Sequence, residues 1–144
     1  MATDSNGSTD LSGRFVIVVD EALAPGLAAN AAAVLALTLG ARVPAIVGAS
    51  FADRDGDEHP GLVDRGLPIL RAPGDALPDL RSRALAAALD VIDMPSFGQQ
   101  TNDYDDFRAR VGQTAAADLR YLGVLVHGPK RAVNKLTGSL ALLR

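Results

Sequence analysis

The chain contains no cysteine and no tryptophan, and only 4% of its residues are aromatic. The lack of cysteine excludes disulfide frameworks, thiolate zinc sites, iron–sulfur clusters and cysteine nucleophiles. It also removes the usual sequence argument for an oxidising compartment, so we expect a cytoplasmic location. The scarcity of aromatic rings argues against recognition of nucleic acid by base stacking.

Long apolar runs and an excess of basic residues are also missing. The longest apolar stretch, residues 27–39, contains Asn30 and Thr38 and is too short to span a bilayer, so we expect no membrane association. The first ten residues are polar and lack the apolar segment of a signal peptide. The net charge of −3 argues against a general binder of polyanions such as nucleic acid.

The residues that are present suffice for one domain. The chain has 144 residues, of which 48% are hydrophobic, and this suits a single domain with its own core. Residues 1–12 are rich in Ser, Thr, Gly and Asp and predict a disordered N-terminal tail. Residues 13–144 predict a single α/β domain.

Strand and helix patterns alternate along this domain. Residues 15–19 form an uninterrupted apolar run, which is typical of a strand covered on both faces. A helix is expected over 26–39, opened by Pro25 and ended by Gly40, and its many alanines would let it lie close against a sheet. Further strands are expected over 43–47, 67–70, 91–94 and 121–126, helices over 78–89, 103–111 and 129–136, and a charged surface loop over 53–60. This alternation predicts a layered α/β domain with its sheet between helices.

Familiar catalytic and metal signatures are absent. No phosphate-loop pattern, no Gly-x-Gly-x-x-Gly fingerprint and no Gly-x-Ser-x-Gly elbow occurs. The loop over 53–60 combines His59 with several acidic residues, but it lacks the glycine and the final glutamate of a calcium loop. We therefore expect a solvated loop, no metal site and no cofactor.

The turn after the first strand is the leading candidate for ligand binding. A strand that runs directly into a helix directs the free amides of the helix at the carboxyl edge of the sheet, where α/β folds bind ligands. Asp20, Pro25 and Gly26 lie in this turn, and Asn30 is the best polar candidate, one turn into an otherwise apolar helix. A buried amide there needs partners, which are either backbone groups or a ligand. The alternative reading of the turn is a well-made connection without a ligand.

Two further stretches could take part. Residues 97–102, which include Gln99, Gln100 and Thr101, concentrate neutral hydrogen-bonding groups after a predicted strand and could line the same edge as Asn30. The alternative interpretation, which is compatible with the first, is a polar loop in which Asn102 or Thr101 caps the next helix. The C-terminal segment is basic and could hold a phosphate or RNA backbone, although such charges more often form the exposed face of a terminal helix. Its basic residues are His127, Lys130, Arg131, Lys135 and Arg144.

Two stretches carry a family resemblance. Residues 15–21 with 25–33 resemble the opening of the bacterial family called domain of unknown function two thousand, and residues 121–124 with 128–140 resemble its closing motif. That family is similar to the type-II peptidyl-tRNA hydrolases, which share the Ala-Ala-amide step at residues 28–30 and the Lys-x-Thr-Gly-x-Leu segment at residues 135–140. The resemblance implies a three-layer α/β/α sandwich with a mixed sheet, peptidyl-tRNA hydrolase II-like, that forms a homodimer.

The hydrolase activity is less well matched than the fold. Those enzymes carry a Gly-Lys-Gly-Lys loop where residues 24–27 read Ala-Pro-Gly-Leu, and no lysine occurs before residue 130. Three hypotheses remain. We favour a small-ligand-binding module around Gly26, Asn30 and residues 99–101. The alternatives are a hydrolase of an ester or amide such as peptidyl-tRNA, in which Asp20, Thr101 or His127 replaces the missing groups, and a dimeric scaffold without a pocket.

Overall fold

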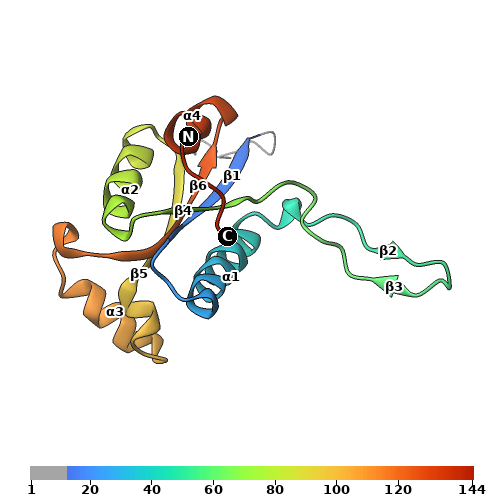
Figure 1. Cartoon of the computed structure of the whole chain (residues 1–144). Helices are drawn as coiled ribbons and strands as arrows, with labels where there is room; N and C mark the ends of the chain where they lie inside the picture. Colours follow the sequence, from blue (N-terminus) through green and yellow to red (C-terminus); the bar gives the residue numbers. More distant parts are fainter. Residues whose placement is uncertain (1–12) are drawn as a thin grey trace, which may run out of the picture.

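A mixed four-stranded sheet organises the chain, and the computed structural model describes it over residues 13–144 (Figure 1). The predicted disordered tail over residues 1–12 lies outside the described residues. The strand order is β4-β1-β6-β5, with β1 parallel to β4 and antiparallel to β6, and β5 antiparallel to β6. The strands are β1 (Arg14–Asp20), β4 (Ile69–Ala72), β5 (Asp90–Pro95) and β6 (Tyr121–Gly128).

Helices cover both faces of this sheet (Figure 1). Phe15, Ile17 and Val19 pack with α1 (Pro25–Arg42) on one face. Val16 and Val18 pack on the other face with α2 (Leu77–Ala86) and α4 (Lys130–Thr137). These five side chains of β1 are all buried, which explains the uninterrupted apolar run. The expected α/β fold with a mixed sheet is confirmed.

The helix α1 is longer than its sequence pattern indicated. Gly40 lies inside it, and the helix ends at Arg42, where the Val43 amide donates to the Leu39 carbonyl. The expected strand over 43–47 is wrong: Pro44, which fixes φ and lacks an amide donor, starts the short 3-10 helix η1 (Pro44–Ile46) instead. Within residues 13–144 no helix is long and apolar enough to cross a membrane.

A hairpin projects from the body between η1 and β4 (Figure 1). Its strands β2 (Phe51–Ala52) and β3 (Glu58–His59) pair antiparallel, and the predicted charged loop forms its exposed tip. Asp53 orders this tip, since its carboxylate accepts from the Asp55 and Asp57 amides at 2.9 and 3.0 Å and lies 3.0 Å from His59 Nε2. The hydrogen bond with His59 lowers the pKa of Asp53. The acidic residues therefore build a turn, and no group of three or more metal-ligating side chains is found in the described part of the chain.

The C-terminal segment covers the edge strand β4. The Arg71 amide donates to the Ala141 carbonyl at 2.9 Å, and the Leu143 amide donates to the Ile69 carbonyl at 2.9 Å. These bonds occupy backbone groups that an exposed edge would otherwise offer to another chain. The opposite edge strand, β5, borders the candidate site.

Candidate functional site

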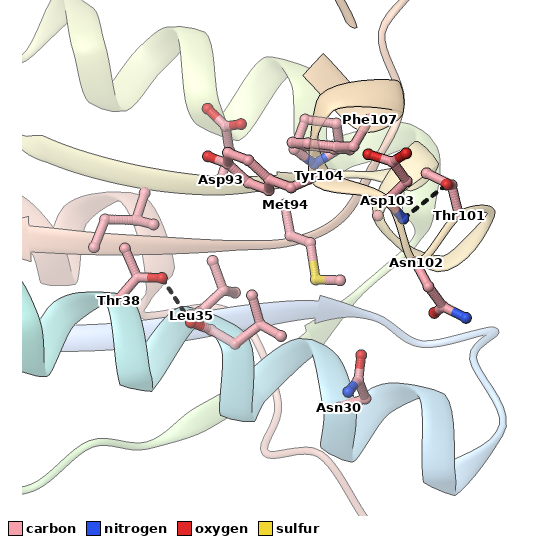
Figure 2. A pocket seen from close by; sticks show the side chains of 14 residues that line it. Asn30, Leu35, Thr38, Asp93, Met94, Thr101, Asn102, Asp103, Tyr104 and Phe107 are labelled. Carbon is pink, nitrogen blue, oxygen red and sulfur yellow. Dashed lines mark hydrogen bonds between the residues drawn. The ribbon is translucent and has the colours of Figure 1, made fainter. Parts of the chain in front are cut away.

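A pocket of about 480 Å³ opens between α1, the edge strand β5 and the segment that leads from the 3-10 helix η3 (Ser96–Gln99) into α3 (Tyr104–Gly112) (Figure 2). Its volume lies in the range of small-molecule sites. Asn30, Val34 and Thr38 of α1 form one wall, because residues four apart share one side of a helix. The other lining residues are Leu35, Ile92, Asp93, Met94, Pro95, Gly98, Thr101, Asn102, Asp103, Tyr104 and Phe107.

The floor of the pocket is apolar and closely packed. Leu35 and Met94 are buried, and both belong to the core on the α1 face of the sheet. Gly98 makes room for Met94: a β-carbon at position 98 would lie 3.1 Å from the Met94 methyl carbon. This floor suits an aliphatic or ring-shaped part of a ligand.

Two side-chain amides face the pocket from opposite walls. Asn30 projects from α1 and Asn102 from the loop before α3, toward the same opening (Figure 2). Both side chains are exposed, so a buried Asn30 amide is not what the structure shows. Neither amide group hydrogen-bonds to another residue within 13–144. Each therefore keeps its donors and its acceptor for a ligand.

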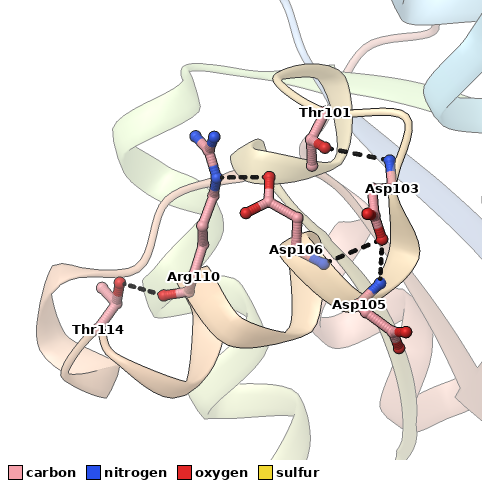
Figure 3. A network of polar contacts seen from close by, with 6 residues as sticks. All are labelled: Thr101, Asp103, Asp105, Asp106, Arg110 and Thr114. Carbon is pink, nitrogen blue, oxygen red and sulfur yellow. Dashed lines mark hydrogen bonds and ion pairs between the residues drawn. The ribbon is translucent and has the colours of Figure 1, made fainter.

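The hydroxyl groups of the two threonines and the carboxylate of Asp103 in the wall already make hydrogen bonds. The Thr38 hydroxyl donates to the Val34 carbonyl at 2.9 Å, and the Thr101 hydroxyl accepts from the Asp103 amide at 3.1 Å. The Asp103 carboxylate accepts from the Asp105 and Asp106 amides at 2.9 and 3.2 Å (Figure 3). Asp103 is thus the N-cap of α3, and the expected cap at Asn102 or Thr101 is wrong. Its carboxylate satisfies the first free amides of the helix.

The charges around the pocket disfavour an anion. None of the fourteen lining residues is Lys, Arg or His. Asp93 is paired with Arg81, whose Nε lies 2.8 Å from the carboxylate, and this hydrogen bond raises the pKa of Arg81. The Arg81 guanidinium also lies over the Tyr121 ring, 5.6 Å from its centroid. An anionic ligand would therefore find no cation in the wall, because Arg81 and the Asp93 carboxylate that it holds lie toward α2, away from the pocket.

The structure brings some of the predicted site residues together and separates others. Asn30 and Thr101 line the pocket. The Gln99 side chain donates to the Leu27 carbonyl at 3.2 Å and ties η3 to α1 beside the pocket. Gln100 is exposed and does not line it. Pro25 and Gly26 begin α1 and also lie outside the pocket lining.

Asp20 and His127 lie outside the pocket as well. The Asp20 carboxylate accepts from the Ala22 amide at 2.9 Å and packs so tightly on Gly74 that a β-carbon there would be 2.5 Å from it. His127 pairs with Asp90 at the start of β5, whereas the pocket uses the other end of that strand. The ligand-binding roles assigned to these residues from the sequence remain predictions, and the geometry groups only Asn30 and Thr101, with Gln99 beside them.

Sequence reasoning missed part of the site. Val34 and Thr38 could have been found, because they follow Asn30 at intervals of four residues on the same helix. Asn102 belongs to the polar run predicted to line this edge, but it was singled out only as a helix cap and not as a ligand-binding residue. Tyr104 and Phe107 line the pocket because α3 packs against η3. No local sequence pattern predicts that contact.

Comparisons with known proteins agree on the fold. The chain is similar to the solved structure of a protein of unknown function from Agrobacterium tumefaciens, with a TM-score of 0.83 and 17% identity over 90% of this chain and 96% of that chain. At this identity the likeness shows the fold alone. No curated protein matches the chain by sequence. The family model for proteins of unknown function named DUF2000 matches residues 13–144. The chain therefore belongs to the DUF2000 family, as its opening and closing motifs indicated.

Proposed function

We propose that this domain binds a small uncharged or cationic molecule in the pocket between α1, β5 and α3. The observation that carries the proposal is the pair of available amides, Asn30 and Asn102, above the apolar floor of Leu35 and Met94. Two amides can each donate to and accept from a ligand, and the floor removes apolar surface from water. We infer a compound that bears amide or hydroxyl groups on an apolar frame.

The hydrolase hypothesis has weaker support. The mixed sheet with helices on both faces and the small-residue helix α1 are what we would expect of a peptidyl-tRNA hydrolase II-like sandwich, and we retain that fold assignment as part of the proposal. The groups nominated to replace the missing lysines are poorly placed, since Asp20 and His127 lie outside the pocket and the Thr101 hydroxyl is engaged. A polyanionic tRNA would also find no cation in the wall.

The basic residues near the C-terminus belong to a different surface. Lys130, Arg131 and Lys135 are exposed on α4, which packs on the face of the sheet opposite α1. A phosphate or RNA backbone bound there would lie on the far side of the sheet from the pocket. We propose the cytoplasm as the site of action on the composition argument alone.

A single-tryptophan reporter tests the proposal. The chain has no tryptophan, and Tyr104 lies at the rim of the pocket with 72% of its surface exposed. Tyr104→Trp therefore places one fluorophore at the site with little expected effect on folding. We expect saturable fluorescence changes with uncharged amides or alcohols and with amines, but not with carboxylates or phosphates. Native mass spectrometry of the purified wild-type chain would show in parallel any small molecule that copurifies.

Matched asparagine variants identify the site. In the reporter background, Asn30→Leu should weaken binding roughly three- to tenfold, the effect of losing about one hydrogen bond. Asn134→Leu removes an exposed amide from α4 and should leave binding unchanged. A response to anions alone, equal binding in both variants, or no response together with no copurifying molecule would contradict the proposal.

A further inference from the structure

The helix α1 has an apolar side that nothing in the described chain covers. No charged residue occurs from residue 25 to residue 41, and a helix that is apolar on every side is normally buried on every side. One side packs on the sheet. The outward side, which we call the outer face of α1, is exposed, and Leu37 leaves 78% of its surface open to solvent. This outer face consists of Leu27, Ala29, Ala33, Val34 and Leu37, with Asn30 as the polar residue among them.

The projecting hairpin is a second uncovered apolar surface. We call residues 47–63 the arm, and Figure 1 shows it extending away from the sheet and helices. Val47, Phe51, Leu62 and Val63 are exposed along it, and Leu62 has 70% of its surface open to solvent. A two-stranded hairpin is only marginally stable by itself in water, so such an arm needs a surface to pack on. Within residues 13–144 no segment covers Phe51, Leu62 or Val63.

The two surfaces match in length, and their charges do not repel each other. The 18 residues of α1 span about 27 Å at the rise of an α-helix. The arm reaches about 26 Å from its base to its turn at the rise of a strand. Its acidic tip meets no like charge on α1, whose first turn contains no acidic residue. The arm therefore meets no like charge along the outer face of α1.

We propose that the arm of one copy packs on the outer face of α1 of a second copy, and that the arm of the second copy packs on α1 of the first in the same way. A second copy is the occupant because one chain carries both halves of the contact, as a two-fold symmetric interface requires. The arm and the outer face together approach the roughly 20–30 residues that each partner contributes to a standard interface. The contact shares Asn30 and Val34 with the pocket wall but needs no ligand, so the dimer is tested without one and its failure would leave the proposed function open to its own test.

Sedimentation velocity on the 144-residue chain at micromolar concentration tests this dimer. We expect a particle of twice the chain mass for the wild type. Leu37→Lys on α1 and Leu62→Glu on the arm should each sediment as monomers, because a buried charge without a partner opposes association. Leu85→Glu alters a comparably apolar residue, 48% exposed on α2 across the sheet, and should remain dimeric. Circular dichroism confirms that each variant is folded.

Mixing the two monomeric variants identifies the surfaces that meet. A mixed dimer of Leu37→Lys with Leu62→Glu contains one unaltered arm-to-α1 contact and one contact in which lysine faces glutamate. Dimer should therefore reappear in the mixture. A contact between two α1 helices would be broken by Leu37→Lys and left intact by Leu62→Glu. A contact between two arms would be broken by Leu62→Glu and left intact by Leu37→Lys. A monomeric wild type, a dimeric single variant of either kind, or a mixture that stays monomeric would overturn the proposal.

Discussion

The imidazole ring of His127 stacks on the phenyl ring of Phe15, with ring centroids 3.9 Å apart and ring planes 3° apart. The two residues are direct partners in the pairing of β1 with β6, and both are buried. His127 Nδ1 also lies 3.3 Å from the Asp90 carboxylate. This stack closes the end of the sheet away from the pocket. His127, which the sequence suggested as a ligand-binding residue, therefore has an evident packing role.

Substitution at His127 should separate packing from binding. His127→Ala should lower the free energy of unfolding by about 2–4 kcal/mol, because it removes a buried ring and leaves a cavity. His127→Phe keeps a flat ring against Phe15, so its free energy of unfolding should fall much less than that of the alanine variant. Urea unfolding followed by circular dichroism measures both. If the phenylalanine variant unfolds as easily as the alanine variant, packing is not the main role of this side chain.

A glycine in β6 should set how closely α1 approaches the sheet. A β-carbon at Gly123 would lie 3.0 Å from Leu35 Cδ1 and 3.2 Å from the Val18 carbonyl oxygen. Gly123→Ala should therefore lower the free energy of unfolding by about 1–3 kcal/mol through overpacking. Gly40→Ala is the control, because it lies inside α1 with no atom within 4 Å of the added carbon. It should raise the stability by about 0.5–1 kcal/mol, measured at the same protein concentration.

The parts of the fold that could be predicted are those with local causes. The apolar run of residues 15–19 is uninterrupted because β1 is covered on both faces, and the alanines of α1 indicate close packing on a sheet. The error at residues 43–47 has a local cause as well. The composition there resembles a strand, but Pro44 removes an amide donor and the backbone turns into η1.

The candidate site could be predicted only in part, because its two walls are distant in sequence. Asn30 was found as a lone amide on an apolar helix, and the polar run before α3 was recognised as a group. Which of its members would face Asn30 depends on how η3 and α3 pack. Thr101, Asn102 and Asp103 are all good caps, and the choice of Asp103 is what leaves the Asn102 amide available.

Removal of that cap should loosen the pocket wall. Asp103→Ala takes away the acceptor of two backbone amides and should cost about 1 kcal/mol of stability (Figure 3). Because α3 carries Tyr104 and Phe107 into the pocket, ligand binding in the Tyr104→Trp reporter should weaken too. Asp103→Asn retains an acceptor and should preserve both properties. Thermal unfolding and fluorescence titration test the pair, and equal behaviour of the two variants would contradict this role.

The buried phenol of Tyr121 makes stability depend on alkaline pH. Burial raises the pKa of Tyr121, and the nearby positive charge of Arg81 lowers it in part. Since the pKa is higher in the folded chain than in the unfolded chain, the buried phenol adds stability below the unfolded pKa and loses it as pH rises through the folded pKa. The free energy of unfolding should therefore fall above the ordinary tyrosine pKa of 10.0.

Absorbance titration of a single tyrosine measures this directly. The chain has two tyrosines, so Tyr104→Phe leaves Tyr121 as the only phenol. Its ionisation midpoint should lie above 10.0. Arg81→Met in the same background should raise the pKa of Tyr121 further, because it removes the cation that favours the phenolate and leaves the nearby Asp93 charge uncompensated. A midpoint at or below 10.0 would show that burial does not control the pKa of Tyr121, and a lower midpoint after loss of Arg81 would show that the Arg81 charge does not lower it.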